Sequence, residues 1–132
     1  MERGTVATTH TIEGRALTNK ELGLIESGEE PAFAARPMFV TVNDGEHWQS
    51  PLLLLTDRRL VISKDKLIGR PKADFTADWS EVSKVRGEPW NGGGPLIQLV
   101  VQTNHASIEL IMQPQHAVEV ESAIRNGYSS RR

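Results

Sequence analysis

Two short apolar runs in the middle of the chain predict a β-hairpin. Residues 51–56 contain four consecutive leucines, and residues 59–63 read Arg-Leu-Val-Ile-Ser. Asp57 and Arg58 separate the runs, and apolar runs of this length that are bounded by turn residues are typical of buried strands. We therefore expect two antiparallel strands joined by a tight turn.

Strict alternation predicts the next strand, over residues 73–80. Ala73, Phe75, Ala77 and Trp79 alternate with polar residues there, which indicates one buried and one solvent-facing side. We expect a shorter fifth strand over residues 82–86.

Period-two patterns also predict the first strand and the last two. The first strand places Met38, Val40 and Val42 on one face and ends at an Asn-Asp-Gly turn. The last two cover residues 97–101 and 106–112. Between the fifth and sixth strands, the glycines and prolines of residues 88–95 predict an exposed loop.

Helical signals appear near both ends of the chain. Pro114 suits a first helical position, and Ala117, Val120 and Ile124 recur at helical spacing before Gly127, which is expected to end the helix. A capping-box pattern predicts a short helix over residues 17–27. We expect a polar tail over residues 1–16, one domain over residues 17–128 and a short tail over residues 129–132.

These elements predict a mainly β fold of seven antiparallel strands followed by one helix. The connections are too short for parallel crossovers, and closing the sheet removes exposed strand edges. The expected architecture is a barrel or orthogonal sandwich with the C-terminal helix over one end.

Composition limits the class of protein. A chain of 132 residues fits one domain, and its net charge of −2 gives no global attraction to nucleic acid or to an anionic membrane. It has no cysteine, no signal-peptide pattern and no apolar run of membrane-spanning length. We expect a cytoplasmic protein, peripheral to the inner face of the membrane if it binds lipid, and no nucleic-acid partner.

One segment carries a family resemblance. Residues 53–63, Leu-Leu-Leu-Thr-Asp-Arg-Arg-Leu-Val-Ile-Ser, resemble the signature of bacterial PH-like (pleckstrin-homology superfold) and GRAM-like domains, in which a hydrophobic strand runs through Thr-(Asn/Asp)-(Arg/Lys)-Arg-Leu into the next strand. Gly28-Glu29 before the first strand and the final helix support it. The resemblance implies a PH-like barrel in which these residues are scaffold. A physical reason is that Thr56 and Asp57 can bond nearby backbone amides and set the turn.

The only basic stretch supplies the candidate ligand-binding residues. Four cations, Lys64, Lys66, Arg70 and Lys72, fall between the third and fourth strands. They could bind phosphate through charge-assisted hydrogen bonds, or they form an ordinary solvated loop. In eukaryotic PH domains, a basic hairpin that joins the first two strands binds inositol phosphates. The basic stretch of this chain lies between the third and fourth predicted strands and therefore departs from that pattern.

Three apolar residues are candidate interaction residues. Leu67 and Ile68 lie among those cations, where they would either insert into a membrane interface or pack inward. Trp90 lies at the rim of the glycine-rich loop, where it would either contact a partner or pack on the barrel.

Nothing in the sequence suggests catalysis. There is no Gly-x-Ser-x-Gly motif, no pair of histidines at ligand spacing and no helix after the Gly-Gly-Gly run. We therefore predict no enzyme, no cofactor and no metal site. The leading hypothesis is a module for protein interaction or self-assembly, because members of the resembling family often associate through strand edges and loops. The alternative is binding to anionic lipid or phosphoinositide-type headgroups through residues 64–72.

Overall fold

The computed structural model describes residues 23–43, 45–49, 51–64, 72–92 and 94–129. These residues form nine strands, a 3₁₀ turn and one helix. The elements are β1 (Pro31–Ala35), β2 (Phe39–Val42), β3 (Glu46–Gln49), β4 (Leu52–Thr56), β5 (Arg59–Ser63), β6 (Phe75–Asp78), η1 (Trp79–Glu81), β7 (Val82–Pro89), β8 (Ile97–Thr103), β9 (Ser107–Met112) and α2 (Pro114–Ser129).

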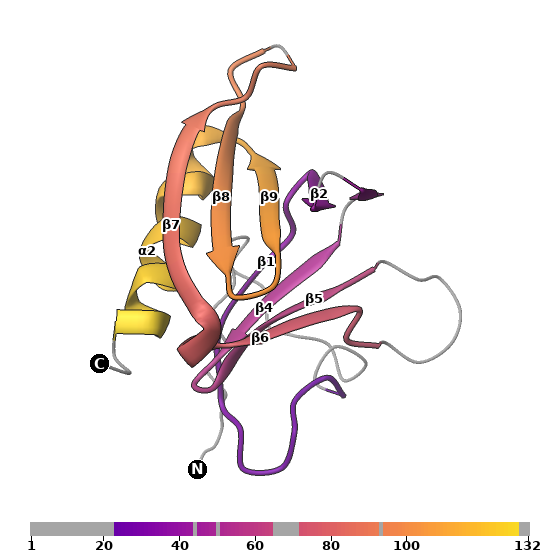
Figure 1. Cartoon of the computed structure of the whole chain (residues 1–132), viewed down its shortest axis with the longest axis vertical. Helices are drawn as coiled ribbons and strands as arrows, with labels where there is room; N and C mark the ends of the chain where they lie inside the picture. Colours follow the sequence, from indigo (N-terminus) through magenta and orange to yellow (C-terminus); the bar gives the residue numbers. More distant parts are fainter. Residues whose placement is uncertain (1–22, 44, 50, 65–71, 93, 130–132) are drawn as a thin grey trace.

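The strands form two antiparallel sheets (Figure 1). The first sheet has the order β1-β4-β5-β6, and the second has the order β3-β2-β9-β8-β7. No ladder joins the two sheets among the described residues, so the predicted closed barrel is wrong, and the fold is a sandwich. The chain crosses between the sheets at Pro37, near Pro51 and through η1 between β6 and β7. Proline favours the first two crossings because it lacks the N–H group that a continuous ladder needs.

The predicted count of seven strands is wrong. The described part of the chain has nine strands, because the bend at Pro37 separates β1 from β2 and because β3 covers residues 46–49, for which no strand was predicted. β1 and β3 are the two strands that the pattern missed. Met38 belongs to the first bend, is 43% exposed and does not share the buried face of Val40, so that prediction is also wrong.

The predicted hairpin is confirmed, and the alternating strand predicted over residues 73–80 is present over residues 75–78. β4 and β5 pair in register from Leu52 opposite Ser63 to Leu55 opposite Leu60. The alternating strand ends at Asp78, and Trp79 begins the turn η1. The amide of Asp78 donates to the carboxylate of Glu81 over 2.9 Å, which fixes this turn.

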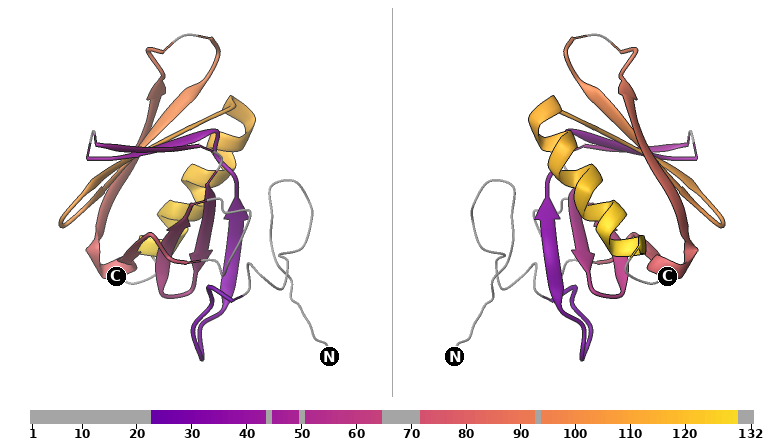
Figure 2. Two further views of the ribbon diagram at one scale, coloured as in Figure 1. Left: turned by 90° about the vertical axis from the view of Figure 1, so that its right-hand side faces the viewer. Right: turned by 90° about the vertical axis from the view of Figure 1, so that its left-hand side faces the viewer.

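The helix α2 covers the open side of the sandwich, as the side views in Figure 2 show. It begins at Pro114 as predicted and buries Ala117, Val120 and Ile124 against the main core. The helix continues through Gly127 to Ser129, so the predicted stop at Gly127 is wrong. The reason is a packing role for this glycine, because a Cβ there would lie 2.4 Å from the indole of Trp79.

The N-terminal helix expected over residues 17–27 has no counterpart in the described residues. Residues 17–22 lie outside them, and residues 23–30 form turns. Among the described residues, no helix is both long and apolar enough to cross a membrane.

Candidate functional site

The two side chains that the sequence indicated at the β4–β5 turn both form hydrogen bonds there. The hydroxyl oxygen of Thr56 accepts hydrogen bonds from the amides of Arg58 and Arg59, each over 3.1 Å. The carboxylate of Asp57 accepts one from the amide of Glu30 over 2.9 Å. The predicted turn-setting role is therefore confirmed for Thr56, whereas the bond from Glu30 to Asp57 ties the turn to the segment before β1.

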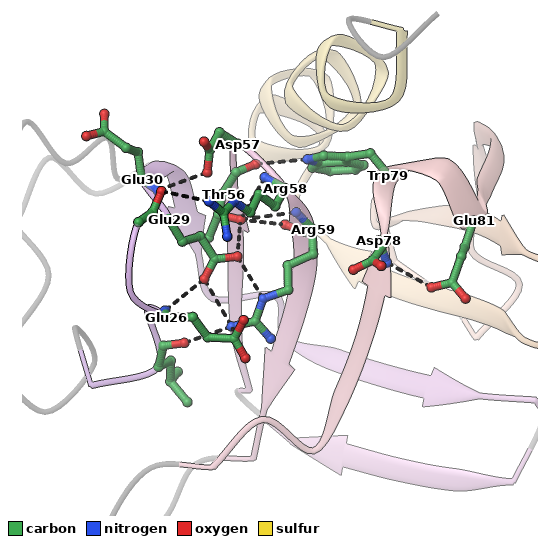
Figure 3. A network of polar contacts seen from close by, with 12 residues as sticks. Glu26, Glu29, Glu30, Thr56, Asp57, Arg58, Arg59, Asp78, Trp79 and Glu81 are labelled. Atoms are coloured by element: carbon green, nitrogen blue, oxygen red, sulfur yellow. Dashed lines mark hydrogen bonds and ion pairs between the residues drawn. The ribbon is translucent and has the colours of Figure 1, made fainter.

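A buried ion pair fastens the segment before β1 to this turn (Figure 3). The guanidinium of Arg59 donates to both carboxylate oxygens of Glu29, over 2.7 and 3.0 Å. The same guanidinium donates to the carbonyl of Leu24, and the hydroxyl of Thr56 donates to Glu29 over 2.7 Å. Residues 24–30 are thereby fixed against β4 and β5, although two charges are withdrawn from water.

The surroundings of the pair favour its ionised form. Burial on its own raises the pKa of Glu29, but hydrogen bonds from Arg59, the Glu26 amide and Thr56 outweigh burial and hold that pKa below its ordinary value. The hydrogen bond to Glu29 raises the pKa of Arg59. The pair therefore stays charged at neutral pH and has a structural role.

A groove of about 580 Å³ lies between β1 and α2. Its apolar lining comprises Ala32, Phe33, Leu55, Trp79, Ala123 and Gly127. Its polar lining comprises Thr56, Asp57, Glu119 and Asn126. Trp79 is fixed in the floor, because its indole N–H donates to the carbonyl of Thr56 over 2.9 Å. The groove combines an apolar floor with a rim that contains two carboxylates and no cation among its lining residues.

The opposite side of α2 is packed directly on β7. The guanidinium of Arg125 donates to the carbonyl of Val85 over 3.2 Å and pairs with Glu121 one turn earlier on the helix. A Cβ at Gly87 would lie 3.2 Å from the side chain of Leu99 and 3.4 Å from the carboxylate of Glu121, so this part of β7 contacts both β8 and the helix.

Solved structures share this arrangement of two sheets and one C-terminal helix. The chain is similar to the N-terminal PH domain of Vps36, with a TM-score of 0.61 and 12% identity over 81% of this chain and 84% of that one. The fold is PH-like. It is also similar to a structure of Vav1 inhibited by an allosteric inhibitor that blocks GEF activity, with a TM-score of 0.58 and 12% identity over 91% of this chain and 30% of that one.

No protein-family model and no curated protein sequence matches the chain. The similarity to known proteins therefore concerns the PH-like fold, on which the site must be assigned from its own residues.

The predicted cationic site falls largely outside the described part of this PH-like domain. Lys66, Leu67, Ile68 and Arg70 lie outside the described residues. Lys64 is described: its ammonium lies 5.0 Å from the ring centre of Trp48, and its amide donates to the carboxylate of Asp74 over 2.7 Å. Lys72 is exposed. Binding through these cations stays a prediction.

Trp90 lies partly buried on the solvent side of the five-stranded sheet of the PH-like domain. Its ring centre is 5.6 Å from that of Phe39, which in turn is 5.1 Å from that of His47. A Cβ at Gly92 would lie 2.2 Å from the ring, so Trp90 is folded back over its own loop. Its predicted role in an interaction stays a hypothesis. No group of three or more potential ligands in the described residues could hold a metal ion.

The groove of the PH-like domain was not predicted from the sequence. Its walls come from β1, which the pattern missed, and from a face of α2 that carries Glu119, Ala123 and Asn126. The available signal was the small apolar run Phe-Ala-Ala of residues 33–35, held between Pro31 and Pro37.

Proposed function

We propose that this chain is a non-catalytic module that binds another protein in the groove between β1 and α2. The observation that carries this proposal is the groove itself, a preformed depression of about 580 Å³ whose floor includes Phe33 and Trp79. Preformed apolar depressions with a few fixed polar groups are usual ligand sites, and the side chains that contribute most to protein–protein binding fill such pockets.

The packing around the groove supports a preformed site. Trp79 is 3% exposed and is held by a hydrogen bond to Thr56, so the floor needs no rearrangement before binding. The turn at the end of the groove is braced by Glu29 and Arg59. A rigid site loses little conformational entropy when a partner binds.

The fold agrees with this role. PH domains commonly bind proteins or phosphoinositide lipids. The groove lining contains two carboxylates and neither lysine nor arginine, which favours a protein ligand over an anionic headgroup at this place.

The test is to fill the groove without changing the rest of the helix. Peptides of about twelve residues would be selected from a displayed random library on the full chain, and their affinity would be measured by fluorescence polarisation. Ala123→Tyr places a large ring in the groove, and we expect it to weaken the selected peptides by about tenfold or more. Ser122→Tyr is the matched control, because Ser122 is exposed on the same helix, and it should leave affinity within about twofold.

Two outcomes would overturn the proposal. One is that no peptide is enriched on the folded chain, and the other is that enriched peptides bind Ala123→Tyr as well as the original chain. Vesicles with and without anionic lipid are the contrasting probe. Vesicle binding that survives Ala123→Tyr and is lost when Lys64, Lys66, Arg70 and Lys72 become alanine would support the lipid hypothesis instead.

A further inference from the structure

The edge strand beside the groove, β1, is the only edge strand in the described part of the chain without a charged residue. The four outermost strands there are β1, β3, β6 and β7. β3, β6 and β7 each contain at least one charged residue, whereas β1 reads Pro-Ala-Phe-Ala-Ala. Charged residues on an edge strand discourage pairing with another chain. In β1 the proline and a register irregularity lie at the start, between Pro31 and Phe33, so the edge is open to pairing over Phe33–Ala35.

The two faces of β1 place this edge directly beside the groove. Phe33 and Ala35 belong to the core that α2 covers, and Ala34 packs into the second cluster on the other face of the sheet. A strand added along β1 would therefore direct every second side chain toward α2 and the groove.

The side of α2 that faces the groove has room for such a side chain. Ala123 and Gly127 are the smallest residues of the lining on this helix, and a residue with a longer side chain at position 123 would occupy the space. The ring of Trp79 packs against Gly127 and lines the same groove as Ala123. An aliphatic or aromatic side chain is the group that this groove would bury favourably.

The rim of the groove adds a charge preference. Glu119 lies on α2, and Asp57 lies on the β4–β5 turn, so carboxylates line the groove from two elements. Glu119 is exposed. A lysine or arginine of the bound segment would meet a complementary potential there, and an acidic residue would be repelled.

From this juxtaposition we propose that the ligand is an extended segment of another protein that adds to β1 as a fifth strand. The segment places an apolar side chain over Trp79 and a lysine or arginine beside Glu119. This inference rests on the proposed function and names the class of partner that the groove accepts.

The first arm of the test probes the backbone of a selected peptide. Each amide in turn is N-methylated, and affinity for the full chain is measured. In strand addition only every second amide donates to β1, so we expect losses of about tenfold at alternate positions and small losses between them. Losses without a period of two would overturn strand addition.

The second arm probes the charge. Glu119→Lys should weaken the binding of a peptide with a basic residue about tenfold. Changing that basic residue of the peptide to glutamate should restore most of the affinity for the Glu119→Lys variant, but not for the original chain. Val118→Lys is the control, because Val118 is 68% exposed and is not part of the groove lining. Equal losses in both variants, or no rescue by the exchanged peptide, would overturn the charge assignment.

The outcomes separate the two proposals. If Ala123→Tyr blocks the peptides, but N-methylation gives no period of two and the exchanged peptide does not rescue Glu119→Lys, the proposed binding function holds and strand addition is overturned. Ligands that ignore Ala123→Tyr would overturn both. A peptide of residues 1–22 that competes as well as the selected peptides, or self-association that Ala123→Tyr abolishes, would identify this chain itself as the occupant and would overturn the assignment to another protein.

Discussion

The helix α2 meets the two sheets in opposite ways along its two sides. Toward β7 the helix presents a long side chain, Arg125, which reaches the strand carbonyl of Val85. Toward β1 it presents Ala123 and Gly127, which leave a groove. On the groove side Gly127 also lets the ring of Trp79 approach the helix. The difference shows that side-chain length along one helix decides which sheet edge is closed and which is open.

The largest expected effect concerns the Glu29–Arg59 ion pair, which fixes the segment before β1 at the end of the groove. Glu29→Gln removes the buried counter-charge of Arg59 at 2.7 Å and leaves only the exposed carboxylate of Glu26 at 3.7 Å. Removing one partner of a buried ion pair costs about 3–5 kcal/mol, and we expect a loss of that size in the free energy of unfolding at pH 7, measured in urea. Glu30→Gln is the control, because Glu30 is exposed. Equal stability of the two variants would show that the pair does not hold this end.

The same substitution should change how stability depends on pH. The folded pKa of Glu29 lies below its ordinary value, so the pair stabilises the fold above that ordinary value and loses this contribution as pH falls through the folded pKa. We expect the gap in stability between the original chain and Glu29→Gln to shrink as the solution is acidified. Urea titrations at several pH values measure that gap, and a gap that grows in acid would contradict the assignment.

A smaller effect is expected at the floor of the groove. Alanine in place of a helical glycine usually gains about 1 kcal/mol, whereas forcing a methyl group into a packed site costs about 1–3 kcal/mol. Because a Cβ at Gly127 would lie 2.4 Å from the ring of Trp79, we expect Gly127→Ala to lower the melting temperature. Ser122→Ala, on the exposed face, should change it little. A rise for Gly127→Ala would show that Trp79 can move aside.

The smallest effect is expected on the closed side. Arg125→Met removes the donor to Val85, and we expect faster amide exchange in residues 85–87 with a smaller drop in melting temperature than Gly127→Ala gives. Arg125→Lys, which keeps a donor, is the control. Peptide affinity for the groove should stay the same. If Arg125→Met weakens peptides as much as Ala123→Tyr does, the two sides of α2 are not independent.

The sequence predicts the local elements of this fold well and the joins between them poorly. The hairpin of β4 and β5 and the start of α2 at Pro114 follow from contiguous patterns and are confirmed. The strand breaks at Pro37 and near Pro51 could not be predicted from local patterns. Whether the chain continues in the same sheet after a proline or enters the other sheet depends on the tertiary arrangement of the two sheets.

The site could not be predicted for a related reason. Glu29 and Arg59 are separated by 30 positions. Glutamate and arginine are usually exposed, so neither residue indicates a buried ion pair in the sequence. Ala32 and Ala123 matter because they are small where two distant elements meet, and small size alone is a weak signal in one sequence. The turn at Thr56 was predictable because the bonds of its hydroxyl to the amides of Arg58 and Arg59 are local.

The bond from Arg59 to the carbonyl of Leu24 also bears on how this domain can be cut or fused. A fragment that starts at β1 would keep every strand, yet it would leave a buried guanidinium with neither its carboxylate nor its carbonyl acceptor. The strands alone therefore do not delimit the independently folding unit. Shortened versions and fusion partners should join the chain upstream of Leu24.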